Sequence, residues 1–371
     1  MPTYSLSTLQ LFITIGFSIS FLIYFSFQIF YFIRYNRNKS HQALPKHKSV
    51  SIIICAKNQA EQLKVNLPSF LNQNYPNFEV IVVNDCSTDN TEETIRFLQK
   101  KHTNLKTTNI PVDEKFNHNK KLALTIGIKA SKHEQLLFSN AHCNPINENW
   151  LKNTIRSISE ANYSGYSNFV NKKGFFYNFM KYDLLMQSLK ISAFSTIGKT
   201  YAANGDNMGY EKSNFFDNKA FAGHSHFEAG YDHLMLRKLS TTSKVISSLS
   251  SDTKININTS NPQASWKKVN LNYYISRKFI PKGIRLLINL EFISKICLYL
   301  FLLAGLLFTN LYIFFGTISL AGLFISGYCF KIVTRDLKEA NLFLSSYVYG
   351  LIRPFFKLLF YIKGLILSKR L

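Results

Sequence analysis

The sequence predicts an α/β domain held between an N-terminal membrane anchor and a C-terminal hydrophobic block. From residue 49 the apolar runs are short and β-branched, and they alternate with helical patterns, which is typical of a parallel sheet with crossover helices. Both ends of the chain carry long hydrophobic runs without charge. A chain of 371 residues has room for one large domain besides such segments.

The N-terminal anchor is predicted over residues 1–34, because residues 9–32 carry no charge and Arg34 is the first basic residue. As a helix this run spans roughly 36 Å at about 1.5 Å per residue, enough to cross a bilayer. A cleaved signal peptide is the alternative, but the run is too long and no A-x-A-like site follows it. We expect an uncleaved anchor, followed by a basic linker over residues 35–48.

The C-terminal block is predicted to form a transmembrane hairpin over residues 284–331. Lys295 and Lys331 enclose a charge-free run that is too long for one span and is interrupted by polar residues near its middle. Residues 332–371 mix apolar runs with lysine and arginine, which is typical of an interfacial or re-entrant helix.

Basic residues follow both the anchor and the hairpin, so the positive-inside rule predicts an inner-membrane protein whose main domain, residues 49–283, is cytoplasmic. The formal net charge of +23 lies largely beside the membrane segments, which favours anionic lipid headgroups over nucleic acid as the partner. The five cysteines show no C-x-x-C spacing, so neither a disulfide framework nor a structural zinc site is expected.

Seven elements are predicted in the first part of the domain: strands at 50–55, 78–83, 105–110 and 135–139, and helices at 60–73, 91–100 and 120–130. Ligands of such sheets bind outside the carboxyl ends of the strands. The polar residues that follow these ends are therefore the candidates for a site: Lys57, Asn58, Asp85, Ser87, Asn140 and His142.

Asp85 is the leading binding candidate. No glycine-rich phosphate loop follows any of the strands, so dinucleotide and P-loop sites are not indicated. Asp89 is well placed to cap the next helix, whereas Asp85 lies too early in the chain for that role. A contact with a ligand remains the better explanation of Asp85.

Three segments in order carry a family resemblance: V-S-I-I-I-C-A-K-N at 50–58, Q-N-Y-P-N-F-E-V-I-V-V-N-D at 73–85, and K-K-L-A-L-T-I-G-I-K at 120–129. They resemble the family 2 glycosyltransferases, inverting enzymes of GT-A fold, over about residues 49–275. The resemblance implies a Rossmann-like mixed sheet flanked by helices. It also implies a nucleotide-sugar donor, a lipid-linked or cell-envelope glycan acceptor, and a divalent metal, Mg²⁺ or Mn²⁺.

The resemblance also implies roles for individual residues. Asp85 would accept a hydrogen bond from the nucleotide base, and Lys120 or Lys121 would lie near the phosphates, whose negative charge a cation must offset. An element at 204–211 that resembles the family's G-x-N-x-A-Y-R keeps Asn207, while Glu211 replaces the arginine. The full nucleotide-sugar set expected from the resemblance is Lys57, Asn58, Asp85, Ser87, Lys120, Lys121 and Asn207.

Three motifs of the family are altered. Asn140 and His142 stand where the metal-binding D-x-D is expected, and they should hold a hard cation more weakly than two carboxylates. Tyr231 takes the position of the catalytic base, and Asp232 could act instead only if the backbone departs from a regular helix, because helical neighbours point about 100° apart. The family's Q-x-x-R-W is replaced at 272–276.

Several alternatives stay open. His142, His224, His226 and His233 could form a transition-metal site, although a polar pocket is favoured. The helix expected at 174–194 could lie at the membrane interface or in the core. The chain is either an active glycosyltransferase or a catalytically inactive relative that serves as a membrane subunit for a protein partner; a lipid-binding or docking role is a more remote option.

Overall fold

The computed structural model describes residues 7–38, 48–111, 119–158, 162–170, 172–219, 221–222, 227 and 229–368. The chain divides into two compact units. Met1–Asn36 and Ile280–Leu359 form the hydrophobic unit, and Arg37–Phe279 and Phe360–Leu371 form the α/β unit.

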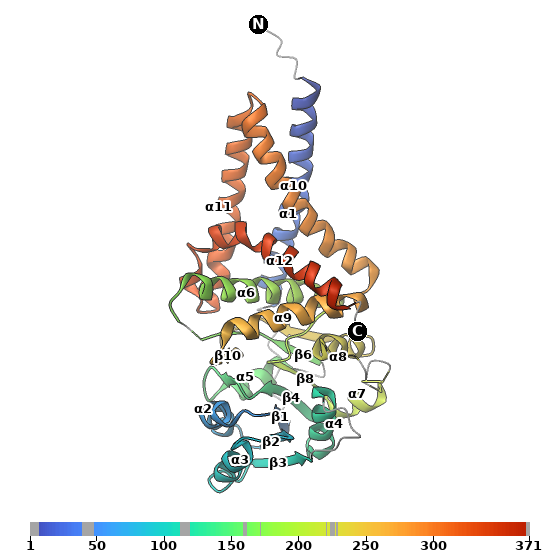
Figure 1. Ribbon diagram of the computed structural model, residues 1–371, viewed down its shortest axis with the longest axis vertical. Coiled ribbons are helices and arrows are strands. Elements are labelled where there is room, and N and C mark those ends of the chain that lie inside the picture. The colour runs from blue at the N-terminus through green and yellow to red at the C-terminus, as the bar shows by residue number, and fades with distance from the viewer. Residues whose placement is uncertain are drawn as a thin grey trace. The chain divides into compact units, whose positions relative to one another are not determined.

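The α/β unit is built on a mixed seven-stranded sheet (Figure 1). Strands β3, β2, β1 and β4 run parallel to one another, whereas β8 pairs antiparallel with β4 and with β6. A smaller three-stranded sheet has the order β5-β10-β7. The strands of the large sheet, in spatial order, are β3 (Leu105–Ile110), β2 (Phe78–Asp85), β1 (Val50–Ala56), β4 (Gln135–Asn140), β8 (Met208–Glu211), β6 (Asn162–Gly165) and β9 (Val245–Ser248); those of the small sheet are β5 (Cys143–Pro145), β10 (Ile255–Ile257) and β7 (Ser167–Phe169).

Helices cover both faces of the parallel half: α2 and α3 lie on one face and α4 on the other (Figure 1). The four strands and three helices predicted for this half are all present, with ends that differ from the predicted ones by two residues or fewer. The helices of the unit are α2 (Ala60–Leu71), α3 (Thr91–Gln99), α4 (Lys120–Ala130), α5 (Trp150–Ser157), α6 (Phe175–Ser195), α7 (Lys212–Asp217), α8 (Tyr231–Leu239), α9 (Pro262–Ser276) and the short η1 (Arg277–Phe279).

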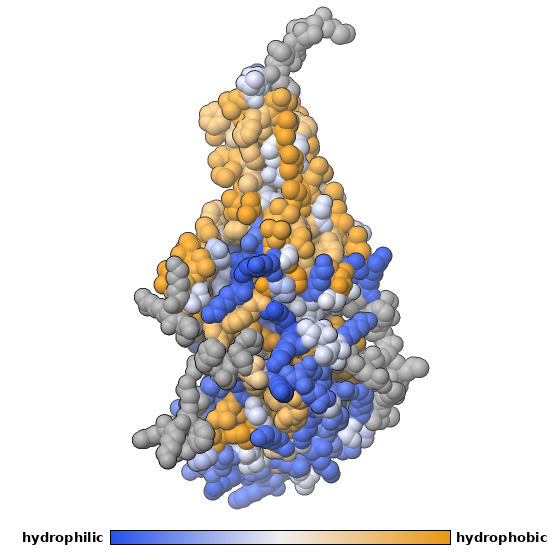
Figure 2. All heavy atoms as spheres, turned by 90° about the vertical axis from the view of Figure 1, so that its right-hand side faces the viewer, coloured by the Kyte–Doolittle hydropathy of each residue, from blue (hydrophilic) through white to orange (hydrophobic). Residues whose placement is uncertain are grey.

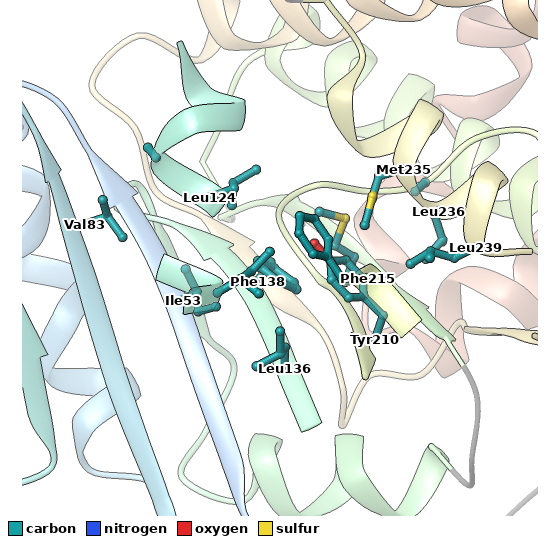
Figure 3. Packing of buried hydrophobic residues seen from close by; sticks show 14 of the residues in the cluster. Ile53, Val83, Leu124, Leu136, Phe138, Tyr210, Phe215, Met235, Leu236 and Leu239 are labelled. Carbon is teal, nitrogen blue, oxygen red and sulfur yellow. The ribbon is translucent and has the colours of Figure 1, made fainter. Parts of the chain in front are cut away.

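A buried core packs α4 against the sheet. Alternate side chains of β1 and β2, among them Ile53 and Val83, pack against Leu124 of α4 in one buried cluster (Figure 3). Gly127 lets the helix approach closely, since a Cβ there would lie 2.7 Å from Ile53 Cγ2. Removing a core side chain of this kind typically costs about 2–5 kcal/mol, so this packing holds α4 firmly against the sheet.

Helix α6 resolves one open alternative in favour of the core. Its Phe179 and Leu185 are buried, and it packs against β7, β9 and α9 of the α/β unit. Asp183 on the same helix is fully buried, and its Oδ2 accepts a hydrogen bond of 2.9 Å from Trp266 Nε1. Such a buried, hydrogen-bonded carboxylate is typical of a helix inside a domain.

Among the described residues, three helices are long and apolar enough to cross a membrane, by length and composition: Thr8–Arg37, Lys282–Phe308 and Tyr312–Asp336. They belong to α1 (Thr8–Asn38), α10 (Lys282–Phe308) and α11 (Tyr312–Asp336). Figure 2 shows hydrophobic side chains covering the visible surface of these helices. Large apolar side chains such as Phe324, 76% exposed, point outward, as expected where the solvent is lipid.

The remaining elements of the C-terminal region are η2 (Ala340–Leu342) and α12 (Ser346–Ser368). Helix α12 contains Pro354, and this helix is not one of the three candidate spans found among the described residues. Its placement at the membrane interface stays a prediction, as do the domain limits drawn from the sequence.

Candidate functional site

Two side chains tie together the loops that follow β1 and β2. Asn58 has a positive φ of 53°, and its backbone N–H donates to Ser87 Oγ at 3.0 Å. The backbone N–H of Thr88 in turn donates to Asn58 Oδ1 at 2.8 Å. Asn58 and Ser87 therefore hold the two loops in register, while Lys57 beside them is exposed.

Asp85 is the last residue of β2, and only 7% of its surface is exposed. The chain turns immediately afterwards at Cys86, which has a φ of 53°. Asp89 has a separate role, because its two carboxylate oxygens accept from Thr91 N at 3.1 Å and from Ala60 N at 3.2 Å. Asp89 thus accepts from the first residue of each helix, α2 and α3, although capping was expected for α3 alone and the N-cap position of α3 is Asn90.

Lys120 reaches the end of β4, and Lys121 lies near Phe221. The Lys120 ammonium donates a hydrogen bond to Asn140 Oδ1 and lies 4.9 Å from the centre of the Tyr231 ring. Lys121 is buried, and its ammonium lies 5.7 Å from the Phe221 ring. Of the two lysines, Lys120 is the one that belongs to this cluster.

Asp206 was not among the residues predicted for the site, but it is part of the same cluster. Asn140 Nδ2 lies 2.5 Å from Asp206 Oδ1, and His142 Nε2 lies 3.5 Å from the same oxygen. The contact follows from the antiparallel pairing of β4 with β8, in which Phe138 is opposite Met208. Residues two positions beyond this pair, Asn140 and Asp206, therefore lie at the same edge of the sheet.

The environment keeps Asp206 ionised. Burial alone would raise its pKa, but the hydrogen bond and charge of His142, together with Asn140 and Lys120, lower the pKa to about 2. Burial and the neighbouring carboxylate raise the pKa of the Cys143 thiol well above its usual value. The cluster thus combines one carboxylate with a neutral thiol.

Burial also raises the pKa of the Cys55 thiol at the end of β1, to about 12, with Lys120 opposing the rise and Asp85 adding to it. Both charged groups therefore act on the same strand end. The strand register agrees, because Ala56 of β1 is opposite Asn84, which precedes Asp85, and Cys55 is opposite Asn140, the hydrogen-bond partner of Lys120.

Tyr231 and Asp232 both reach the loop before β8. Helix α8 starts after Gly230, whose φ is 65°. The backbone N–H of Gly205 donates to Asp232 Oδ2 at 3.0 Å, and a Cβ on Gly205 would lie 2.7 Å from the Tyr231 hydroxyl oxygen and 2.8 Å from Asp232 Oδ2. Tyr231 and Asp232 were expected to point apart as neighbours in a helix. Both side chains nevertheless reach Gly205, because the loop before β8 crosses the first turn of α8.

The chemistry of the two side chains differs. Burial, together with the negative charges of Asp232 and Asp206, raises the pKa of the Tyr231 phenol well above 10. Tyr231 is therefore a neutral hydrogen-bonding group near neutral pH and a poor base. Asp232 is the carboxylate beside the expected base position.

Asn207 and the histidines have local partners. Asn207 is buried, and its Nδ2 donates to the carbonyl oxygens of Tyr166 and Thr253 at 3.0 and 2.8 Å. His233 Nδ1 accepts from Ala203 N at 3.0 Å. His224 and His226 lie outside the described residues. The observed His233 contact is of the kind expected in a polar pocket.

Among the described residues, one group could supply three metal ligands: His142, Cys143 and Asp206, whose ligand atoms lie within 4.8 Å of one another. This set does not fit Mg²⁺ or Mn²⁺, which prefer several anionic or carbonyl oxygens. The side-chain oxygen of Asn140 could add an oxygen ligand, but it accepts a hydrogen bond from the Lys120 ammonium. A metal ion at this position would be repelled by the Lys120 ammonium. Two like unit charges about 4 Å apart repel each other by about 4 kcal/mol near a protein surface, and a divalent ion would double that repulsion.

The mixed sheet with helices on both faces is that of the GT-A fold. The sequence model described as "Glycosyl transferase family 2" matches residues 51–240, slightly more than half of the chain. The chain belongs to this family.

Two relatives give more detail. The chain is 28% identical over 181 residues to a dolichyl N-acetyl-alpha-D-glucosaminyl phosphate 3-beta-D-2,3-diacetamido-2,3-dideoxy-beta-D-glucuronosyltransferase of Methanococcus voltae, covering 47% of this chain and 51% of the relative. It is 34% identical over 107 residues to a poly-beta-1,6-N-acetyl-D-glucosamine synthase of Staphylococcus epidermidis, covering 28% of this chain and 25% of the relative. The matches thus span about half and about a quarter of these proteins.

A solved structure shares the fold over most of the chain. It is a mannosyltransferase from Pyrobaculum calidifontis in complex with GDP-Man and Mn²⁺, with a TM-score of 0.55 and 16% identity, covering 91% of this chain and 99% of that protein. At this identity the likeness establishes the fold alone.

Proposed function

We propose that this chain is a membrane-bound glycosyltransferase that moves a sugar from a nucleotide-sugar donor to a lipid-linked or cell-envelope glycan acceptor. The observation that carries the proposal is the convergence of Asp85, Lys120 and Asp232 on one edge of the sheet. Asp85 follows Asn84, which is opposite Ala56 of β1, and the neighbouring Cys55 is opposite Asn140, which binds Lys120. Lys120 also contacts the Tyr231 ring, and Tyr231 and Asp232 share the Gly205 loop. This arrangement supports a site in which Asp85 would accept from a base N–H, Lys120 would contact phosphate and Asp232 would accept from the acceptor hydroxyl.

The donor would lie across the ends of β1, β2 and β4. Asp85 would accept a hydrogen bond from the nucleotide base, and the Lys120 ammonium would contact the diphosphate. Exposed Lys57 is a second cation at the end of β1. Asn58 and Ser87 would act by holding the loops that line the base, which makes them positioning residues.

The acceptor would approach from the side of α8 and α9. Asp232 would accept the proton of the attacking hydroxyl, and the Tyr231 hydroxyl would orient a neighbouring oxygen by a hydrogen bond. Tyr273 of α9 packs at 6.0 Å against His233 and at 6.4 Å against Tyr201. Such aromatic faces suit the apolar faces of sugar rings. Tyr273 lies in the element that replaces Q-x-x-R-W.

The membrane helices would bring the domain to its acceptor. The three candidate spans support a membrane protein, and the basic flanks support a cytoplasmic domain at the inner membrane. The relative from Methanococcus voltae is named as acting on a dolichyl-phosphate-linked sugar, which supports a lipid-linked acceptor here.

The test is donor binding and turnover by the full chain in detergent. Equilibrium binding of UDP- and GDP-sugars is measured first, and release of the nucleoside diphosphate then follows for any donor that binds. Asp85→Asn should weaken binding by about tenfold, since a hydrogen bond to a charged group contributes about 1.5–3 kcal/mol. Asp217→Asn, an exposed change at the end of α7, is the matched control.

A second candidate function is a non-catalytic membrane subunit that supports a protein partner. One observation favours this role. The position of the catalytic base holds Tyr231, and the raised pKa of its phenol makes it a poor proton acceptor. Donor binding without any turnover, in the presence of acceptor lipids from the source membrane, would favour this role over the enzyme.

A further inference from the structure

We propose that the Lys120 ammonium, held by Asn140, takes the place of the divalent cation in this site, so that the chain binds nucleoside diphosphates without metal. This inference rests on the proposed function, because it concerns how the same site neutralises the donor. It departs from the metal dependence that the family resemblance implies.

The first step of the argument is the orientation of the Asn140 amide. Its Oδ1 accepts from the Lys120 ammonium, and its Nδ2 faces Asp206 Oδ1 at 2.5 Å. Turning the amide over would place two donors together on the lysine side and two acceptors together on the aspartate side. The neighbours therefore fix the orientation, and the one Asn140 atom that could bind a hard cation already contacts an ammonium group.

The second step concerns charge. Asp206 has its direct contacts with Asn140 Nδ2 and His142 Nε2, which both face its Oδ1, while Lys120 acts on it only as a nearby charge. The two groups that Lys120 contacts directly, the Asn140 amide oxygen and the Tyr231 ring, are neutral. Among the described residues no carboxylate hydrogen-bonds to the Lys120 ammonium, so its charge is available to an incoming anion.

The third step is the position of this charge. Lys120 is the first residue of α4, and the Asn119 side chain caps the helix by accepting from Leu122 N at 3.0 Å. The Lys120 ammonium lies at the carboxyl end of β4, where the D-x-D of the family would hold its cation. The Lys120 ammonium at this position supplies the positive charge that would otherwise come with the metal ion. Unlike a metal ion, the ammonium needs no second carboxylate to hold it.

Calorimetry can compare the binding of UDP and GDP to wild type, Lys120→Met and Lys129→Met. The wild-type full chain should bind one of the two nucleotides in EDTA within about threefold of its affinity in Mn²⁺. Lys120→Met should weaken binding by about tenfold or more, as expected for loss of a charge-assisted contact. Lys129→Met, an exposed change at the other end of α4, should bind like wild type.

A reverse substitution provides a second readout. The double variant Asn140→Asp, His142→Asp rebuilds a carboxylate pair, and its binding should become about tenfold or more tighter with Mn²⁺ than in EDTA. Wild-type binding that appears only with Mn²⁺ or Mg²⁺ would overturn this inference and leave the proposed function standing. Equal binding by wild type and Lys120→Met would also overturn it. No nucleotide binding under any condition would overturn both proposals.

Discussion

The amide nitrogen of Asn140 lies 2.5 Å from a carboxylate oxygen of Asp206, although the two residues are 66 positions apart in the sequence. The pair joins the end of β4 to the turn before β8. It gives the site one ionised carboxylate at a place where the altered D-x-D supplies none, and it orients the amide that holds Lys120.

The Asp206 carboxylate should stabilise the fold in a pH-dependent way. Its pKa is lowered from 3.8 to about 2, so the stabilisation is fully present above pH 3.8 and is lost as the pH falls toward 2. The shift corresponds to about 2 kcal/mol. Thermal unfolding of the full chain in detergent should show Asp206→Asn less stable than wild type at pH 7, with a smaller difference at pH 3.

The exposed substitution Asp217→Asn is the control for this comparison, and it should follow wild type at both pH values. A difference between wild type and Asp206→Asn that is the same at pH 7 and pH 3 would show that the ionised carboxylate is not what stabilises this loop.

The two polar side chains at the start of α8 should differ in their effect on turnover. Asp232→Asn removes the proposed base while keeping an oxygen that can accept from Gly205 N–H, so the rate of nucleotide release should fall by about 10²- to 10⁴-fold. Tyr231→Phe removes one hydrogen-bonding group and should lower the rate by about tenfold or less. Equal losses in the two variants would assign the base to neither residue.

Close packing in the hydrophobic unit should depend on Gly305. A Cβ at this position of α10 would lie 2.7 Å from the ring of Phe315 on α11, whereas a Cβ at Gly316 would meet nothing within 4 Å. Overpacking typically costs about 1–3 kcal/mol. Gly305→Leu should therefore lower the unfolding temperature in detergent, and Gly316→Leu should change it much less. A larger loss from Gly316→Leu would contradict this helix pairing.

The domain should be reachable only from the cytoplasm. In a variant whose five native cysteines are replaced, a single cysteine introduced at exposed Lys100 should react with a membrane-impermeant thiol reagent in inverted vesicles and not in intact cells. Labelling in intact cells would reverse the proposed orientation.

The parallel half of the fold could be predicted from sequence because each of its strands and helices has a hydrophobic pattern within its own residues. Buried strands such as β1 appear as continuous β-branched runs, and each is followed by a helix of clear periodicity. The same reasoning identified Asp85 at a strand end and separated it from the capping residue Asp89. The family resemblance implies that Lys120 or Lys121 lies near the phosphates, which stays a prediction; Lys120 is the one that contacts Asn140 at the end of β4.

The part of the site that could not be predicted depends on pairing between distant segments. Asp206 joins the cluster only because β8 runs antiparallel to β4, and the four residues of β8 carry little pattern of their own. The available signal was the N-G-D-N turn directly before an apolar strand. Likewise, the shared approach of Tyr231 and Asp232 to Gly205 depends on a loop crossing the helix start, which helical periodicity does not encode.

The most direct test of the central claim is binding of UDP- and GDP-sugars to the purified full chain, with wild type, Asp85→Asn and Asp217→Asn measured side by side. The proposed site predicts saturable binding of at least one donor, weakened by about tenfold in Asp85→Asn and unchanged in Asp217→Asn. Absence of binding to every donor, or binding that Asp85→Asn leaves intact, would contradict a nucleotide-sugar site at this edge of the sheet.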